Sequence, residues 1–156
     1  MLKNWAIKGF IGLSCLAAIG GAAGCGQDMI HSTYQFQVED VSQVNVNQQT
    51  NIDVTLKATE IRSEGYDKVL IRVDATNKDN LELKATDTQS QEWDVAQVGY
   101  WGPPDGFAIT KDYDVTTEFR VTAKAEGAYT VTLNLVDLDN NDAVLATKTI
   151  TFTAAQ

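Results

Sequence analysis

Residues 126–135 read EGAYTVTLNL, and this stretch decides the fold class. It opens on a glycine turn signal at Gly127. Apolar residues then alternate with threonine and asparagine, and they are Tyr129, Val131, Leu133 and Leu135. This period of two is typical of a β-strand with one buried face and one wet face. The stretch therefore predicts a turn followed by a half-buried strand.

The same alternation recurs along most of the chain. Six further segments carry it, at 52–58, 69–75, 81–85, 93–95, 119–125 and 150–154, and residues 34–46 add one or two strands. Turn signals separate the segments at intervals of about ten residues, at 63–65, 77–80, 126–127 and 139–142. No stretch after residue 25 has sustained helical periodicity. Short strands at this spacing predict an all-β antiparallel sandwich of about seven to nine strands.

The turn at Gly127 followed by Tyr129 resembles the tyrosine corner of immunoglobulin-like domains, in which the tyrosine hydroxyl bonds back to the backbone. Residues 114–153 as a whole are similar to bacterial Ig-like and PKD-type modules. This resemblance implies an immunoglobulin-like sandwich over residues 34–156, and it assigns no functional residues. It also suggests that Trp93 is a core residue, in the place that Ig domains give a tryptophan on their third strand.

The chain begins with a cationic segment and then an apolar one. Lys3 and Lys8 precede an uncharged run at 9–24, which is the layout of a secretory signal. That run is short for a transmembrane helix, which needs about 20 apolar residues. Residues 22–25, AAGC, resemble the lipobox of bacterial lipoproteins, in which the cysteine is diacylated and becomes the new N-terminus. The lipobox usually has leucine where this chain has Ala22, so ordinary cleavage that leaves a free thiol is the alternative.

The lipoprotein resemblance implies three parts: a signal peptide at 1–24, an acylated Cys25 with a short tether at 25–33, and the sandwich at 34–156. Cys15 leaves with the signal, so Cys25 has no partner for an internal disulfide, and acylation accounts for it. The implied location is the extracytoplasmic face of a bacterial membrane, with the lipid bilayer as a partner through Cys25.

The net charge excludes one class of partner. Two of the 12 basic residues leave with the signal, so ten face 21 acidic residues, and the formal charge falls from −9 to near −11. So acidic a domain is repelled by phosphate backbones, which excludes nucleic acid.

The residue inventory argues against an enzyme. The chain has a single histidine, His31, which is expected to be solvated in the tether, and no second histidine or free thiol stands beside it, so the sequence offers no Ser-His-Asp, Cys-His or zinc constellation. A pair of carboxylates of the glycoside hydrolase type is a remote alternative.

Two loops are candidate sites. Residues 99–107, GYWGPPDGF, hold three aromatics and the only two prolines, so we expect a stiff loop. Rigid aromatics make good recognition anchors, and the candidate ligand-binding residues are Tyr100, Trp101 and Phe107. The alternative is that Trp101 and Phe107 plug the sandwich.

The second loop is the acidic turn at 137–142. Asp137, Asp139 and Asn141 sit at alternate positions, as calcium ligands do in an EF-hand, but Lys148 stands where the last ligand should be glutamate. A tight hairpin turn without metal is the favoured interpretation, because Asp and Asn tolerate a left-handed backbone, and no cofactor is expected unless the turn binds Ca²⁺. We therefore expect a non-catalytic envelope module that binds a protein or glycan or has a structural role. A calcium-stabilised adhesion or solute-handling module is the alternative.

Overall fold

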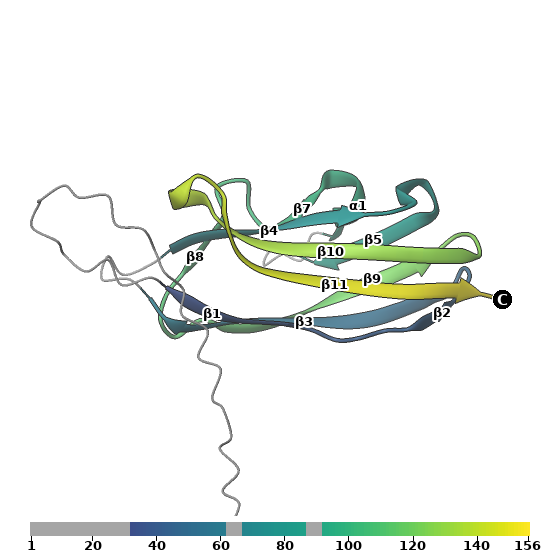
Figure 1. The fold of residues 1–156 in the computed structure, drawn as a ribbon, viewed down its shortest axis with the longest axis horizontal. Coiled ribbons are helices and arrows are strands. Elements are labelled where there is room, and N and C mark those ends of the chain that lie inside the picture. Colours follow the sequence, from purple (N-terminus) through teal and green to yellow (C-terminus); the bar gives the residue numbers. More distant parts are fainter. Residues whose placement is uncertain (1–31, 62–66, 87–91) are drawn as a thin grey trace, which may run out of the picture.

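The computed structural model describes residues 32–61, 67–86 and 92–156, and it forms two packed β-sheets (Figure 1). One sheet has the strand order β1-β3-β9-β5-β6, and the other has β2-β11-β10-β4-β7, with β8 also paired to β4. The strands are β1 (Thr33–Val38), β2 (Gln43–Asn45), β3 (Gln49–Glu60), β4 (Asp67–Ala75), β5 (Leu81–Thr86), β6 (Glu92–Asp94), β7 (Tyr100–Trp101), β8 (Phe107–Ile109), β9 (Asp114–Ala123), β10 (Gly127–Asp137) and β11 (Ala143–Ala155). Single helical turns occur at η1 (Lys78–Asn80), α1 (Val95–Val98) and η2 (Leu138–Asn140).

The alternation read from the sequence places the core. The apolar residues of each pattern face between the sheets, where they are buried, and those of β3, β4, β9 and β10 include Ile52, Val54, Leu56, Val69, Ile71, Val73, Phe119, Val121, Tyr129, Val131, Leu133 and Leu135. The threonines and charged residues between them lie on the outer faces. Burial of this apolar surface is the main stabilising term, because the described chain carries no disulfide.

The strand order is that of an immunoglobulin-like sandwich. The series β1-β3-β9-β5 corresponds to the A-B-E-D sheet, and β4-β10-β11 corresponds to C-F-G. The first strand switches sheets: β1 pairs with β3, whereas β2 pairs in parallel with the end of β11. The predicted fold class is therefore confirmed.

The predicted tyrosine corner is present. The Tyr129 hydroxyl donates to the carbonyl of Ala125 at 2.8 Å, and its ring stacks on Phe152 with centroids 5.4 Å apart. The hydroxyl also lies 3.4 Å from the carbonyl of Asn80, at the start of β5. One side chain thus joins the two sheets where the chain crosses from β9 to β10.

Trp93 departs from the prediction. It lies on β6, the edge strand that follows β5, and not on β4, which is the third strand of the Ig order. Its side chain is half-buried and packs against the rim of the core. The alternating pattern at 93–95 also ends early, because Asp94 caps the helical turn α1.

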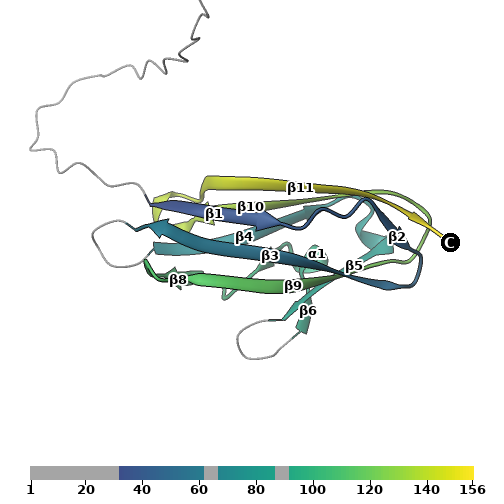
Figure 2. The same ribbon diagram turned by 90° about the horizontal axis from the view of Figure 1, so that it is seen from below.

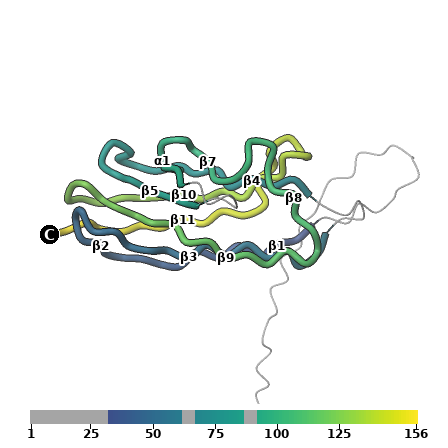
Figure 3. The backbone as a smooth tube through the Cα atoms, turned by 180° about the vertical axis from the view of Figure 1, so that it is seen from behind, coloured from purple at the N-terminus to yellow at the C-terminus, as the bar shows by residue number. Residues whose placement is uncertain are grey.

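The two ends of the sandwich are distinct. The chain enters at Thr33 at one end and leaves at Gln156 at the other (Figures 1 and 3). The entry end also carries the start of β4, the end of β10 and the start of β11 (Figure 2). Residues 1–31, with Cys25 and His31, lie outside the described part of the chain.

Candidate functional site

An insertion between β5 and β9 closes one side of the sandwich. Its first strand, β6, extends the five-stranded sheet beside β5, and its later strands, β7 and β8, extend the other sheet beside β4. The chain therefore crosses from one sheet edge to the other between residues 92 and 109. This side lies opposite the edge formed by β1 and β11.

Trp101 and Phe107 fill the space beneath the insertion. Only 4% of Trp101 and 6% of Phe107 is exposed, and their ring centroids lie 4.6 Å apart. The Trp101 ring also meets Phe119 edge-on at 5.8 Å, and its indole N–H donates to the carbonyl of Thr86 at 3.4 Å. The structure thus places these two predicted anchors in the core, where they offer almost no surface to a ligand.

Two glycines allow the loop to lie so close to the core. A Cβ atom on Gly102 would lie 2.4 Å from the Phe107 ring, and one on Gly106 would lie 2.6 Å from Leu138 and 2.9 Å from the Val69 carbonyl. Both glycines have positive φ, at 125° and 79°, which other residues rarely adopt. The glycines in the motif therefore serve the packing of this loop.

Tyr100 is the predicted anchor that keeps an accessible face. Its ring lies edge-on to Trp93, with centroids 6.4 Å apart, and both side chains are half-buried. Val98, two residues earlier, is 46% exposed. We call Trp93, Val98 and Tyr100 the insertion patch. The sequence pointed to Tyr100, whereas its pairing with Trp93 depends on the chain path between them.

The frame beneath the insertion patch is rigid. The Asp94 carboxylate accepts from the backbone N–H groups of Ala96 and Gln97 at 3.1 and 3.4 Å, which caps α1. The Gly99 carbonyl accepts from the backbone N–H of Val73 at 2.8 Å, which ties the end of α1 to β4. The backbone that carries the patch is therefore ordered by its own hydrogen bonds.

Charged side chains lie on the outer face of the β5–β9 sheet, whereas Trp93 pairs with buried Ala85 on the inner face. Glu92 forms ion pairs with Arg120 at 2.5 Å and with Lys84 at 3.4 Å. A hydrogen bond from Lys84 lowers the pKa of Glu82, and the same bond raises the pKa of Lys84. Among the described residues, the indole nitrogen of Trp93 and Nε of Arg120 are buried and have no hydrogen-bond partner. The outer face beside β6 therefore presents paired carboxylates and cations.

The carboxylates of the acidic turn accept hydrogen bonds from backbone N–H groups. The Asp137 carboxylate, in a residue only 9% exposed, accepts from the backbone N–H of Asp139 at 3.0 Å and caps η2. Asp139 accepts from the backbone N–H of Lys68 at 3.2 Å, and Asn141 adopts a left-handed conformation. Within residues 32–61, 67–86 and 92–156, no group of three or more His, Cys, Asp or Glu side chains is placed to hold a metal ion. The turn has the geometry of a capped hairpin.

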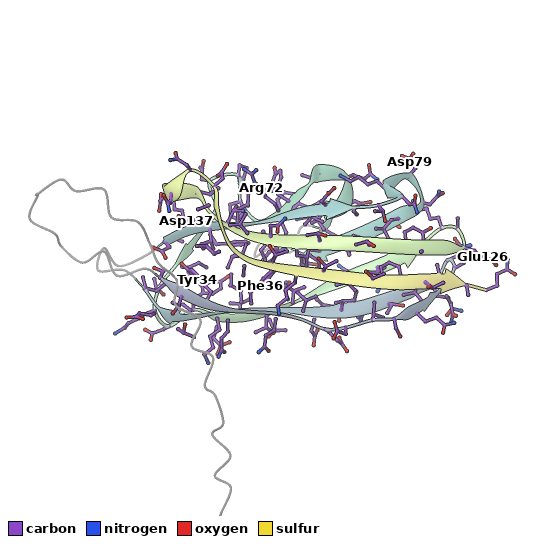
Figure 4. All side chains as sticks on the ribbon, viewed as in Figure 1. Tyr34, Phe36, Arg72, Asp79, Glu126 and Asp137 are labelled. Atoms are coloured by element: carbon purple, nitrogen blue, oxygen red, sulfur yellow. The ribbon has the colours of Figure 1, made fainter. Side chains whose placement is uncertain are left out.

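A buried polar contact at the entry end has no signal in the sequence. The Tyr34 hydroxyl donates to the carboxylate of Asp67, a residue that is 2% exposed, and Asp137 lies close enough to act on the same phenol. Burial raises the pKa of Tyr34, and the hydrogen bond to Asp67 raises it further. Figure 4 shows Tyr34 and Asp137 at the same end of the sandwich, with Glu126 at the other. The contact fastens the first strand to β4.

No protein-family model and no curated protein matches this chain. Among solved structures, the chain is similar to AvmM, which catalyses macrocyclization in alchivemycin A biosynthesis. The two share 8% identity and a TM-score of 0.53, over 81% of this chain and 90% of that one.

Two further solved structures are similar at lower scores. A CARDB domain from Pyrococcus furiosus, in complex with di-metal ions, has 17% identity and a TM-score of 0.45 over 85% of this chain and 93% of that one. Domains 4 and 5 of the S-layer protein SbsC have 12% identity and a TM-score of 0.45 over 81% of this chain and 48% of that one. At such identities the likeness is one of fold alone.

Among the residues that the structure describes, no helix is long and apolar enough to cross a membrane.

Proposed function

We propose that this chain is an exported lipoprotein whose Ig-like sandwich binds a protein or glycan partner at the cell envelope without catalysing a reaction. The anchor is Cys25, which follows a cationic and apolar signal and a small-residue tripeptide at 22–24. Two acyl chains on one residue give the double anchor that stable membrane attachment requires. Cleavage before Cys25 removes residues 1–24 and leaves the anchor at the new N-terminus.

The anchor sets the orientation of the domain. Strand β1 begins at Thr33, eight residues after Cys25. An extended chain of that length reaches about 25 Å at most. The entry end, with Tyr34 and Asp137, therefore lies nearest to the bilayer. The C-terminal end lies farthest from it, and the insertion patch lies on the flank.

The pairing of Trp93 with Tyr100 on a capped and tied frame is the observation that carries the recognition proposal. Aromatic rings offer a large contact area and lose little conformational entropy on binding. A frame that is already ordered lowers the entropy cost of binding further. Glu92, one residue before Trp93 on β6, adds a partly exposed carboxylate that could contact the hydroxyl groups of a glycan or the side chains of a protein.

We assign no catalytic role, because the single histidine, His31, lies in the tether and the sandwich therefore has no histidine for a Ser-His-Asp or Cys-His arrangement. Similarity of fold to AvmM at 8% identity does not transfer its activity. No specific observation on the described residues favours a calcium-stabilised module or a hydrolase.

Detergent phase partition tests the anchor. The parent chain and the Cys15→Ser variant should enter the Triton X-114 phase, whereas Cys25→Ser should stay in the aqueous phase. Partition of Cys25→Ser into detergent would show that another segment holds the protein in the membrane.

Photocrosslinking in cells tests the patch. A benzophenone amino acid at position 100 should capture an envelope component, and the same group in place of Gln35, an exposed residue on β1, should not. Tyr100→Ala should reduce recovery of the captured component. Equal capture at both positions would rule out the insertion patch as the recognition surface.

A further inference from the structure

Strand β11 has an open edge along most of its length. Strand β10 pairs with it from Ala143 to Ala154, but on the other side β2 covers only Thr153–Ala155. Strand β1 runs along that side, yet it belongs to the other sheet and pairs with β3 (Figure 2). Within the described residues, no strand is therefore hydrogen-bonded to the outer side of the β11 backbone from Ala143 to Phe152.

The hydrogen bonds at the covered end tell which backbone groups face this edge. The N–H of Thr153 donates to the carbonyl of Ser42 at 3.0 Å, and the carbonyl of Ala155 accepts from Val46 at 2.9 Å. Alternate residues of an antiparallel strand direct both backbone groups to the same side. The N–H and C=O groups of Thr147, Thr149 and Thr151 therefore point outward.

The composition of this edge differs from that of the rest of the chain. Residues 143–156 contain no Asp or Glu and one charged residue, Lys148, although the chain carries 21 acidic residues. The side chains of Thr147, Thr149 and Thr151 are exposed, and β-branched residues of this kind favour strand pairing. Two copies of this acidic protein could thus approach along β11 without bringing carboxylates together.

We propose that β11 pairs antiparallel with β11 of a second copy, about a two-fold axis at Thr149. Because the backbone groups of Thr149 point outward, this residue can form a hydrogen-bonded pair with its own symmetry mate. Thr147 then lies opposite Thr151 of the second copy, which makes favourable threonine pairs. Lys148 lies opposite Ile150, so the register places no like charges face to face.

The same edge limits the pairing to a closed dimer. A β-bulge at Leu145 breaks the register on one side, and β2 covers the strand from Thr153 on the other. Bulges and lysines are the devices that keep edge strands from open-ended aggregation. Only residues 147–151 pair. In the dimer this edge of each copy is already paired, so a third copy cannot add to it. The contact is small, so we expect a weak dimer.

Cysteine crosslinking tests the proposed register between the two β11 strands. The full chain carries Cys15→Ser and Cys25→Ser, so that an introduced cysteine is its only thiol and the test does not depend on lipidation. In the proposed dimer the Cα atoms of Thr149→Cys and its mate lie about 5.5 Å apart, within disulfide range. Those of Thr147→Cys and its mate lie about 14 Å apart along the strand. Mild oxidation should crosslink the first variant and not the second.

A double variant and a proline complete the test. Thr147→Cys with Thr151→Cys should crosslink, because these positions face each other. Thr149→Pro removes only an outward N–H, which an edge strand tolerates, so it should keep the melting temperature within a few degrees and lose the dimer in sedimentation. Equal crosslinking of the Thr149→Cys and Thr147→Cys variants, or none in either, would overturn the proposed pairing.

Discussion

The ring of Trp101 lies 4.6 Å from the ring of Phe107, beneath the loop that joins them. The contact brings together residues from β7 and β8, both of which pair with β4. Through this contact, the aromatic loop packs over the core and covers the side of the sandwich between β5 and β4. Tyr100, one residue before Trp101, packs edge-on against Trp93 instead and keeps a partly exposed ring.

Alanine substitutions of the neighbouring residues Trp101 and Tyr100 should therefore differ in their effect on stability. Trp101→Ala should lower the free energy of unfolding by about 3–5 kcal/mol, because it leaves a cavity against Phe107 and Phe119. Tyr100→Ala should lower it by less than about 1 kcal/mol. Urea unfolding of both variants beside the parent chain measures the difference. Equal losses would place Tyr100 in the core as well.

The glycines of the loop should tolerate alanine poorly. Gly102→Ala would push a methyl group into the Phe107 ring and also strain a backbone with φ of 125°. Gly127→Ala is the matched control, because its φ of 144° carries the strain while nothing lies within 4 Å of the added Cβ. Thermal melting should show a clearly larger loss for Gly102→Ala. A larger loss for Gly127→Ala would mean that backbone strain dominates.

Much of the fold could be predicted from the sequence, because strand alternation depends on local spacing. Ile52, Val54 and Leu56 face the core as their period of two requires. The tyrosine corner at Tyr129 was also readable, because its partner Ala125 is only four residues away.

The site was less predictable, because its contacts join distant residues. Nothing near Tyr34 in the sequence indicates Asp67, and nothing near Trp93 indicates that it sits on an added edge strand beside Tyr100. The loop motif at 99–107 contains three aromatic residues, and three-dimensional packing decides that Trp101 and Phe107 are buried while Tyr100 stays partly exposed.

The contact between Tyr34 and Asp67 should give a pH dependence above the neutral range. The pKa of Tyr34 is raised in the folded chain above its ordinary value of 10.0. The contact between Tyr34 and Asp67 therefore contributes fully to stability below about pH 10, the ordinary pKa of tyrosine. This contribution is lost as the pH rises toward the pKa of Tyr34 in the folded chain. Tyr34→Phe should lower stability at pH 7 and flatten the decline above pH 10.

Urea midpoints from pH 7 to 11 measure this effect, with Tyr100→Phe as the control that removes the same atom elsewhere. If Tyr34→Phe declines as steeply as the parent chain, the contact contributes nothing to the alkaline transition.

Calcium should leave the stability unchanged. The carboxylates of Asp137 and Asp139 already accept backbone N–H groups, so the turn is ordered by its own caps. Melting temperatures in calcium and in chelator should agree. Asp137→Asn should lower stability by about 1 kcal/mol equally in both conditions. A calcium-dependent rise that Asp137→Asn abolishes would instead establish a metal site at this turn.

The two proposed surfaces lie on opposite edges of the sandwich, since β11 and β7 stand at opposite sides of their sheet. A dimer formed through β11 would hold two insertion patches facing outward. Two linked sites raise the avidity for a repetitive partner without any new contact.

The mass of the mature N-terminus decides whether this chain is a lipoprotein. The protein is extracted from membranes and its N-terminal peptide is analysed by mass spectrometry. We expect a peptide that begins at Cys25 and carries the added mass of a diacylglyceryl group. A peptide that begins at another residue, or that carries an unmodified Cys25 thiol, would contradict this expectation.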